Sequence, residues 1–307
     1  MVNVESLLIV LLFNLASIIE KSEIEGDYFV ELTEYNELKT RVLNKIDNYK
    51  QPQTDELTFV KNVSCGEDHT LLLDYEGNVW SFGLNLNGQL GHGHVKTVER
   101  PAKISGFKSK ITQIQSEDNI NFAIDDKGDS YMWPWTDKSG NINWHPTRLP
   151  FTEKIYTVAC GHNFALFATT NGDVYSMGGT NKYGQLGHGD YNPALRPKLI
   201  EFFTINSERI NNISCGYKHC AARSVTGKVY TWGLGVKGQL GHGDFNNYTL
   251  PYQVKVDTPF TKVLEVSCGF RSVFYLTESR KIYFTGCTAN IGMQNFPALF
   301  NPGDKVL

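Results

Sequence analysis

The chain has 307 residues, of which 41% are hydrophobic and 20% are charged, and its net charge is −3. This composition supports a sizeable buried core and argues against an intrinsically disordered protein. Because sequence-independent binding to DNA or RNA requires a basic surface, we expect no nucleic acid partner.

The most apolar segment lies at residues 7–19 and has the sequence LLIVLLFNLASII. A membrane-spanning helix needs about 20 apolar residues, so this segment is short for that role. It also lacks the basic start and the small-residue cleavage site of a secretory signal. We expect residues 1–24 to form an apolar segment, with helix as one option, that packs on the rest of the molecule or closes its edge. Contact with a membrane is the less favoured alternative.

The next feature along the chain is a repeated motif. The hexapeptide GQLGHG occurs three times, beginning at Gly88, Gly184 and Gly238. A Cys-Gly pair precedes each copy at a nearly constant distance, and the cysteines are Cys65, Cys160 and Cys215. A proline follows each copy in the same way, and the prolines are Pro101, Pro197 and Pro251. With the weaker copies included, the spacing is roughly 51 residues, a period typical of propellers and solenoids.

Two weaker copies complete this series. One begins at Cys268 and has Pro302 as its last landmark, and the other centres on Ser116, lacks the hexapeptide and has Pro150 as its last landmark. A sixth, degenerate copy is suggested because residues 25–35 (EGDYFVELTEY) resemble residues 65–75 (CGEDHTLLLDY). The predicted repeats therefore span residues 25–57, 58–107, 108–151, 152–203, 208–257 and 260–307.

Each complete repeat contains four short stretches with strand character. In the first complete copy they are rich in β-branched and aromatic residues and lie at residues 58–66, 69–75, 78–83 and 101–104. A turn at Gly77 joins the second stretch to the third, and GQLGHG forms a glycine loop before the fourth. Four short antiparallel strands in each repeat of this length make one blade of a β-propeller. We predict an all-β fold built from such blades.

The order of landmarks resembles the repeat of the regulator of chromosome condensation family. The shared landmarks are Cys-Gly, then His, then Gly-x-Val-Tyr/Trp-x-x-Gly, then Gly-Gln-Leu-Gly-x-Gly, and they recur through residues 58–307. The resemblance implies a β-propeller, and the family's type member has seven blades. Five clear copies and one degenerate copy lead us to expect six blades here, in a monomer whose N-terminal segment helps to close the ring.

The recurrent histidines and glycines could also be interpreted as a site for a metal or a phosphate. Metal-ligand spacing is missing, and equivalent residues of different repeats lie a blade apart, so we expect no metal and no cofactor. The hexapeptide lacks the lysine of a phosphate-binding loop and leads into a strand, which favours a structural role. No catalytic constellation is present, so we expect no covalent catalysis and at most nucleotide exchange activity. The six cysteines are interpreted as reduced thiols of a cytoplasmic protein.

Two regions interrupt the repeat pattern, and such interruptions often carry function. The first, residues 133–144, replaces the hexapeptide with a tryptophan-rich loop, and the second is the pair of loops that follow GQLGHG in later repeats. Aromatic residues on loops are enriched as interface anchors. The candidate partner-binding residues are Trp135, Asp137, Trp144, Asp190, Tyr191, Asp244, Phe245 and Tyr248. The alternatives are that the tryptophans pack on a neighbouring blade and that the later loops are plain turns.

The family resemblance also implies a function. Its best-known activity is guanine-nucleotide exchange on the small GTPase Ran, and similar repeats engage Rab GTPases, including repeats in effectors of intracellular bacteria. We therefore expect a small GTPase partner of Ran or Rab type. We expect the protein to act in the cytoplasm, or in the host cytoplasm if it is a secreted effector, and the nucleus is an alternative location. The competing hypotheses are a non-catalytic scaffold in ubiquitin, trafficking or cytoskeletal assemblies, and a chromatin-binding protein. The acidic pI of about 6.2 disfavours chromatin binding.

Overall fold

The computed structural model describes residues 60–136, 140–255, 262–288 and 292–300. The predicted apolar segment at residues 1–24 and the degenerate repeat at residues 25–57 lie outside these ranges. No helix within the described ranges has the length and apolar character needed to cross a lipid bilayer.

The described residues form five four-stranded antiparallel sheets, each consecutive in the chain. Blade 1 consists of β1 (Val60–Cys65), β2 (His69–Asp74), β3 (Val79–Gly83) and β4 (Val98–Lys103). Blade 2 consists of β5 (Ile111–Glu117), β6 (Ile120–Asp125), β7 (Ser130–Trp133) and β10 (Thr147–Arg148), with a small hairpin of β8 (Trp135–Thr136) and β9 (Ile142–Asn143).

The remaining three blades follow the same order. Blade 3 consists of β11 (Ile155–Gly161), β12 (Phe164–Thr169), β13 (Val174–Gly178) and β14 (Ala194–Leu199), and helix α3 (Glu201–Ile205) follows it. Blade 4 consists of β15 (Ile210–Cys215), β16 (His219–Ser224), β17 (Val229–Gly233) and β18 (Tyr248–Val254). Blade 5 consists of β19 (Val263–Cys268), β20 (Ser272–Thr277), β21 (Ile282–Thr288) and β22 (Gly292–Phe300).

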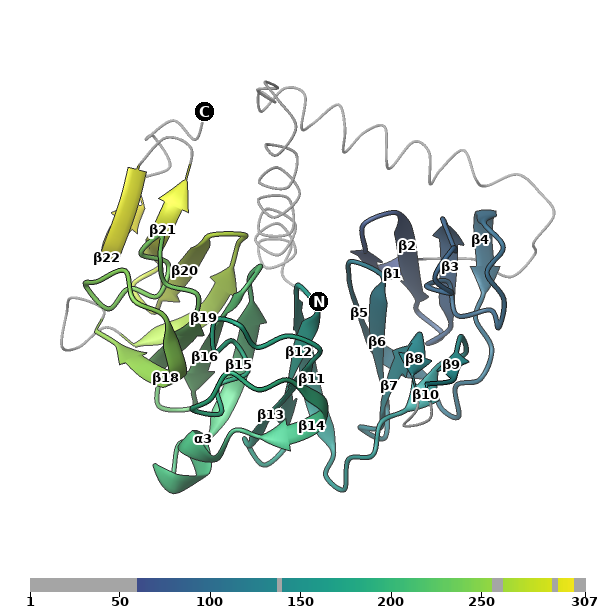
Figure 1. The fold of residues 1–307 in the computed structure, drawn as a ribbon, viewed down its shortest axis with the longest axis horizontal. Helices are drawn as coiled ribbons and strands as arrows, with labels where there is room; N and C mark the ends of the chain where they lie inside the picture. Colours follow the sequence, from purple (N-terminus) through teal and green to yellow (C-terminus); the bar gives the residue numbers. More distant parts are fainter. Residues whose placement is uncertain (1–59, 137–139, 256–261, 289–291, 301–307) are drawn as a thin grey trace.

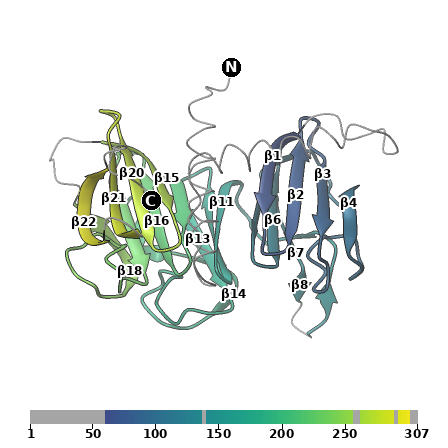
Figure 2. The same cartoon turned by 90° about the horizontal axis from the view of Figure 1, so that it is seen from above.

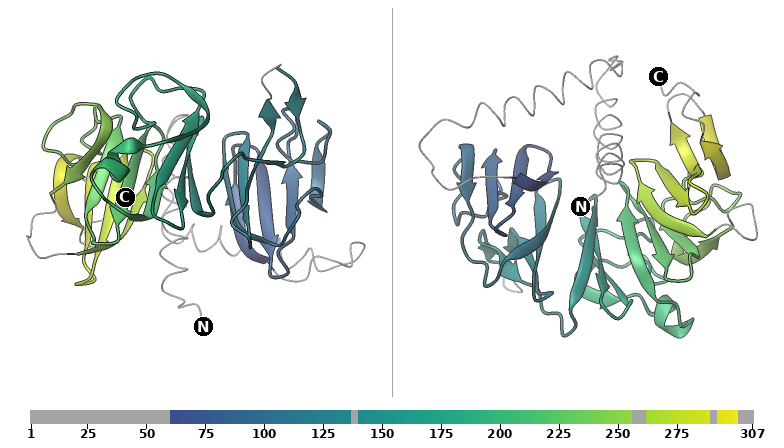
Figure 3. Two further views of the ribbon diagram at one scale, coloured as in Figure 1. Left: turned by 90° about the horizontal axis from the view of Figure 1, so that it is seen from below. Right: turned by 180° about the vertical axis from the view of Figure 1, so that it is seen from behind.

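The five blades are arranged around a common centre. The first strands β1, β5, β11, β15 and β19 lie inside and pack against one another in this order, whereas β4, β14, β18 and β22 lie at the periphery (Figure 1). Blades 1 and 5 stand at the two ends of the arc in every view (Figures 2 and 3). The predicted all-β propeller of four-stranded blades is therefore confirmed, and the proposed sixth blade falls on residues outside the description.

The hydrophobic core is divided into clusters that lie between neighbouring blades. One cluster joins blades 1 and 2, and the next three join blades 2 and 3, 3 and 4, and 4 and 5. Trp133 and Trp232 are completely buried in two of these clusters. Burial of a large apolar side chain contributes about 1.5–3 kcal/mol, so the blades stabilise each other through these contacts.

The glycine loop of each blade is bound by the blade that follows it. The indole nitrogens of Trp133 and Trp232 donate hydrogen bonds to the backbone carbonyls of Gln89 and Gln185, at 3.1 and 2.9 Å. Each glutamine side-chain carbonyl accepts a backbone N–H two residues earlier in its own loop. The Gln89 side-chain amide also donates to Asn119 Oδ1 of blade 2 at 2.9 Å. The hexapeptide therefore has a structural role, as the sequence predicted, and it connects neighbouring blades through its main chain and through the Gln89 side chain.

The proline landmarks of the two weaker copies need correction. Strand pairing places Lys103 opposite Trp80 and Arg148 opposite Tyr131, so the blade 2 equivalent of Pro101 is Pro146 and not Pro150. The same comparison in blade 5 replaces Pro302 with Pro297. The connection between the third and fourth strands is shorter in these blades than in the others, so a constant offset from the cysteine selected prolines too far along the chain.

The alternation of strand direction creates two distinct faces. In each blade, the turn between the first and second strands and the loop between the third and fourth strands leave from the same edge. We call the surface formed by these turns and loops the loop face. The other connections, including helix α3, belong to the opposite face. The hexapeptides and the described residues predicted as sites all belong to the loop face, which makes it the candidate functional surface.

Candidate protein-binding face

The two-residue turn between the first and second strands is a variable part of the loop face in the five described blades. The two preceding positions hold Cys-Gly in four of the five described blades, but the two central residues change from blade to blade. In order around the arc, these turn residues are Glu67-Asp68, Asp118-Asn119, His162-Asn163, Tyr217-Lys218 and Phe270-Arg271. The turns therefore change from acidic in blade 1 to aromatic and basic in blades 4 and 5.

The turns of blades 2 to 5 contact each other in a continuous stack. Asp118 lies 2.8 Å from the His162 Nδ1 nitrogen, and the His162 and Tyr217 rings lie 4.5 Å apart between centroids. The Tyr217 ring in turn stacks on Phe270 at 4.4 Å with an interplanar angle of 29°. We call this row of Asp118, His162, Tyr217 and Phe270 the aromatic ladder. Because ring stacking fixes side-chain geometry, the ladder presents a preorganised surface.

Cations flank the aromatic ladder at its basic end. The Lys218 ammonium lies 4.6 Å from the centroid of Tyr217 and 5.2 Å from that of Tyr183. The Arg271 guanidinium lies 5.2 Å from the centroid of Phe270, and Arg271 is exposed. Cation–π contacts of this kind keep both charges close to the rings while leaving them able to bind carboxylates. Blades 4 and 5 therefore present a basic, aromatic surface.

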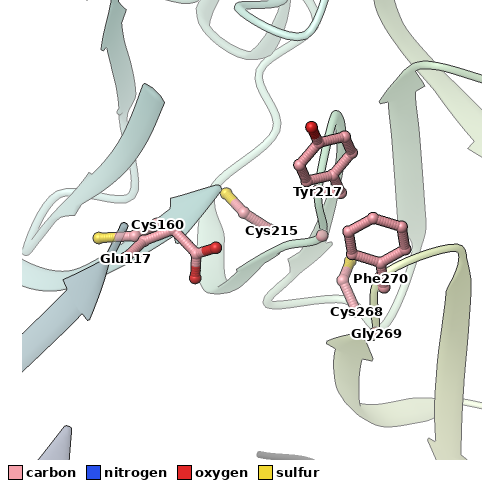
Figure 4. Close-up of a pocket in the computed structure, with 8 residues that line it drawn as sticks. Glu117, Cys160, Cys215, Tyr217, Cys268, Gly269 and Phe270 are labelled. Carbon is pink, nitrogen blue, oxygen red and sulfur yellow. The ribbon is translucent and has the colours of Figure 1, made fainter. Parts of the chain in front are cut away.

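A small pocket opens beside the aromatic ladder, near the inner ends of the first strands. Its lining includes Cys215 between Glu117 and Cys160 on one side and the rings of Tyr217 and Phe270 on the other (Figure 4). The turns themselves thus surround a shallow recess at the centre of the arc. The recess holds little more than a water molecule, so it is open to a small molecule of similar size and not to a large ligand.

Buried histidines hold the turns of blades 1 and 4 in place. The rings of His69 and His219 lie against Gly66 and Gly216, where a β-carbon would overlap the ring. The His219 Nε2 nitrogen is 3.1 Å from the Ser272 carbonyl of blade 5. Burial lowers the pKa of His219 to about 4, so the ring is neutral at pH 7. These histidines support the binding surface and do not belong to it.

The hexapeptide histidines are also structural. The His92, His188 and His242 rings lie 2.8–3.0 Å from a hydroxyl of the third strand of their own blade. That hydroxyl donates to the carbonyl of the hexapeptide leucine, so each histidine closes its glycine loop. Burial lowers the pKa of His188 and of His242 to about 4. Within the described residues, no group of three His, Cys, Asp or Glu side chains has an arrangement that could hold a metal ion.

The tryptophans predicted as anchors pack against neighbouring blades instead. Trp135 is buried, and the Arg196 guanidinium of blade 3 lies 4.9 Å from its ring centroid. Trp144 is half-buried and lies against Gly88 in the glycine loop of blade 1, where it leaves no room for a β-carbon. Both positions agree with the alternative that these tryptophans pack on a neighbouring blade. Asp137, predicted in the same loop, lies outside the described residues.

The loops after the hexapeptide contain both turn-forming and exposed residues. Asp190 accepts the Asn192 backbone N–H, and this hydrogen bond lowers the pKa of Asp190. Asp244 accepts the hydroxyl of Tyr248 at 2.9 Å, so both side chains are engaged within their own loop. The aromatic residues beside them remain available, with Tyr191 60% exposed and Phe245 46% exposed. Of the seven predicted residues that the structure describes, Tyr191 and Phe245 are the two with exposed side chains at the rim of the loop face.

Sequence reasoning missed the aromatic ladder, although a signal was present. The turn residues differ between copies although a Cys-Gly pair precedes them in four of the five described blades, and a variable pair beside a constant one is a candidate for partner contact. What the sequence could not show is that Asp118, His162, Tyr217 and Phe270 contact each other. These residues lie about one repeat apart, and only the arrangement of the blades brings them together.

A family model adds to these structural features. The model of the RCC1-like domain matches residues 33–297. The chain belongs to the RCC1-like domain family. This RCC1-like chain is 34% identical over 257 residues to the ultraviolet-B receptor UVR8 of Arabidopsis thaliana, covering 78% of the chain and 57% of UVR8. It is 28% identical over 258 residues to protein RCC2 of Homo sapiens, covering 73% of the chain and 49% of RCC2.

The fold of this RCC1-like chain also matches solved structures. The crystal structure of Prp20p from Saccharomyces cerevisiae, described with its binding to Gsp1p and histones, has a TM-score of 0.66 at 23% identity. The match covers 78% of this chain and 65% of Prp20p. The chain spans about half the length of the curated RCC1-like relatives it matches, so functions of those whole proteins do not transfer directly.

Proposed function

We propose that this RCC1-like propeller binds a small GTPase of Ran or Rab type through its loop face, as an exchange factor or as a ligand of the GTPase. The observation that carries the proposal is the aromatic ladder with its flanking cations. Rigid aromatic and arginine side chains at the centre of a surface are typical of protein-binding hot spots. Family membership supports a GTPase as the partner, because exchange on Ran is the family's best-known activity.

The charge pattern of the loop face favours one orientation of the partner. Glu67 and Asp68 are exposed on the acidic blade 1, whereas Lys218 and Arg271 lie on blades 4 and 5. A partner with acidic groups over blades 4 and 5 and basic groups over blade 1 would be attracted and oriented. Complementary charges of this kind raise the association rate and suppress wrong partners. The opposed charges on one face therefore suit a specific partner more than a generic polyanion.

Nucleotide exchange needs no covalent chemistry from such a surface. A surface that binds the nucleotide-free GTPase more tightly than the loaded form lowers the affinity for nucleotide by the same factor. A GTPase ligand would bind both forms alike and leave the release rate unchanged. This difference separates the two versions of the proposal.

The test is nucleotide release and direct binding with purified proteins. The full chain is mixed with a panel of Ran and Rab GTPases carrying a fluorescent guanine nucleotide. Faster release from one GTPase supports exchange, and saturable binding without faster release supports a ligand role. Absence of both across the panel would overturn the proposal. We place this binding in the cytoplasm, and imaging of the tagged full chain in cells tests that location.

A second candidate is a non-catalytic scaffold. The exposed aromatic residues Tyr191 and Phe245 at the rim of the loop face would serve any protein partner, and they carry no feature specific to a GTPase. Purification of the tagged chain with its bound proteins distinguishes the two. Recovery of one ubiquitin, trafficking or cytoskeletal complex without a GTPase would favour the scaffold.

A further inference from the structure

Blade 4 carries a cysteine pair that the other described blades lack. The last residue of its first strand, Cys215, stands directly opposite Cys220 in the second strand. The equivalent pairs are Cys65 with Thr70, Ser116 with Asn121, Cys160 with Ala165, and Cys268 with Val273. The repeat keeps a cysteine at the first position in most blades, but blade 4 alone among the five described blades has a thiol at both.

The backbone geometry of this pair suits a disulfide. The adjacent pair closes the hairpin, because the Gly216 N–H donates to the His219 carbonyl at 2.9 Å. Hydrogen-bonded and non-hydrogen-bonded pairs alternate along antiparallel strands, so Cys215 and Cys220 form a non-hydrogen-bonded pair. The α-carbons of such pairs are about 4.5 Å apart, within the range of disulfides. The two sulfur atoms are 4.0 Å apart, so side-chain rotation rather than backbone movement would bring them together.

The two thiols differ in access. Cys215 is half-buried and lines the pocket beside the aromatic ladder (Figure 4). Cys220 is completely buried, and its thiol donates to the Gln185 carbonyl of blade 3 at 3.2 Å. Burial raises the pKa of the Cys220 thiol well above its usual value, so Cys220 is a poor first target for an oxidant. An oxidant that enters the pocket therefore meets Cys215 first.

We propose that Cys215 and Cys220 form a peroxide-sensitive dithiol at the base of the blade 4 turn of the loop face. A hydroperoxide oxidises the Cys215 thiol to a sulfenic acid and is itself reduced to water or an alcohol. The Cys220 sulfur then attacks the Cys215 sulfur, the S–S bond forms, and the sulfenic oxygen leaves as water with the Cys220 proton. A thiol reductant restores both thiols by exchange.

The disulfide would act on the binding surface directly. Tyr217 and Lys218 lie between the two cysteines in the chain, so an S–S bond would close the turn that presents both. It would also draw the Cys220 sulfur away from the Gln185 carbonyl, which keeps its second donor, the Trp232 indole. The proposal concerns the chemistry of the chain itself and holds whichever protein the loop face binds.

The experiment uses the full chain, treated with hydrogen peroxide and then alkylated and digested with trypsin without reduction. Trypsin cleaves after Lys218, between the two cysteines, so the disulfide would join peptides 210–218 and 219–223. We expect this linked pair to appear with a mass loss of two hydrogens and to vanish after a thiol reductant. Cys215→Ser and Cys220→Ser should each abolish it, and a serine at position 220 keeps a donor for the Gln185 carbonyl.

Two matched variants of blade 1 serve as controls. Cys65→Ser should leave the linked peptides unchanged. Thr70→Cys supplies a second cysteine in the equivalent register, at a position whose threonine hydroxyl lies 3.9 Å from the Cys65 sulfur, and should add one further disulfide. Circular dichroism of each variant confirms that it is folded. Recovery of 210–218 and 219–223 only as separate alkylated peptides, or of Cys215 linked to Cys160 or Cys268 instead, would overturn the proposal.

Discussion

At the scale of single residues, the histidines of the repeat show how burial changes the pKa of a side chain. His219 is completely buried, and loss of hydration lowers its pKa from about 6.5 to about 4. Because the folded state binds fewer protons than the unfolded state between these values, stability falls as the pH falls through this window. His69, His92, His188 and His242 share the same direction of shift. The fold should therefore be sensitive to mild acid.

His219→Gln tests this account at one position. Glutamine can still donate to the Ser272 carbonyl but does not titrate. With pKa values of about 6.5 in the unfolded state and 4 in the folded state, His219 alone should lower the free energy of unfolding by about 2 kcal/mol between pH 7 and pH 5. Urea unfolding at both pH values should show a correspondingly smaller loss in the variant. Equal losses in the variant and the original protein would contradict a neutral, buried His219.

Residue roles were only partly predictable from the sequence. The sequence indicated loop packing for His92, His188 and His242, and the structure shows these contacts within each blade. The role of Trp135 could not be decided, because a loop tryptophan can be an anchor or a packing residue. Its environment depends on Arg196 of the next blade, and that contact between blades is invisible in a linear sequence.

At the scale of the element, the Cys-Gly turn is the most constrained part of each blade. A β-carbon at Gly216 would overlap both the His219 ring and the Gly269 carbonyl of blade 5. The His219 ring is completely buried beside the Ser272 carbonyl, and the Gly269 N–H donates to that same carbonyl, so neither the ring nor the Gly269 backbone can move away cheaply. The glycine is therefore needed for close packing between blades.

Gly216→Ala should lower the free energy of unfolding by about 2 kcal/mol or more. Gly179→Ala is the matched control, because Gly179 is exposed and a β-carbon there meets nothing within 4 Å. The control should change stability by at most about 0.5 kcal/mol. Thermal or urea unfolding of both variants measures the difference. A Gly216→Ala protein as stable as the control would show that the turn is more tolerant than this packing implies.

Strands were predicted well because the alternation of apolar residues and the glycine turns recur in each copy. The third and fourth strands of blade 1 are joined by fourteen residues, 84–97, whereas those of blade 5 are joined by only three, 289–291. A proline chosen by its distance from the cysteine therefore did not identify the last strands correctly. Strand pairing, which fixes Pro146 and Pro297 as the true equivalents, depends on contacts that the sequence does not display. Variation in the length of one loop was enough to make the predicted position of the last strand wrong.

At the scale of the whole molecule, the arrangement of the blades places residues that are distant in the sequence side by side on one surface. The five turn pairs lie about one repeat apart in the chain, and the packing of the blades brings four of them into one stacked row. The opposed charges at its two ends follow from the same arrangement. The sequence predicted a propeller with a binding role, but it could not predict that the turns of four blades contact each other in one row, which is the surface that we propose for partner binding.

The most direct test compares how charge reversal on the loop face and charge reversal on the opposite face change the affinity for the partner. Lys218→Glu with Arg271→Glu reverses the basic end of the aromatic ladder. Lys127→Glu with Lys281→Glu makes the same change in net charge at exposed turns of the opposite face. We predict that the dissociation constant for the GTPase rises about tenfold or more in the first variant, with a weaker dependence on salt. The second variant should bind within about twofold of the original protein. Equal affinities for both variants, or a loss confined to the second, would contradict binding through the loop face.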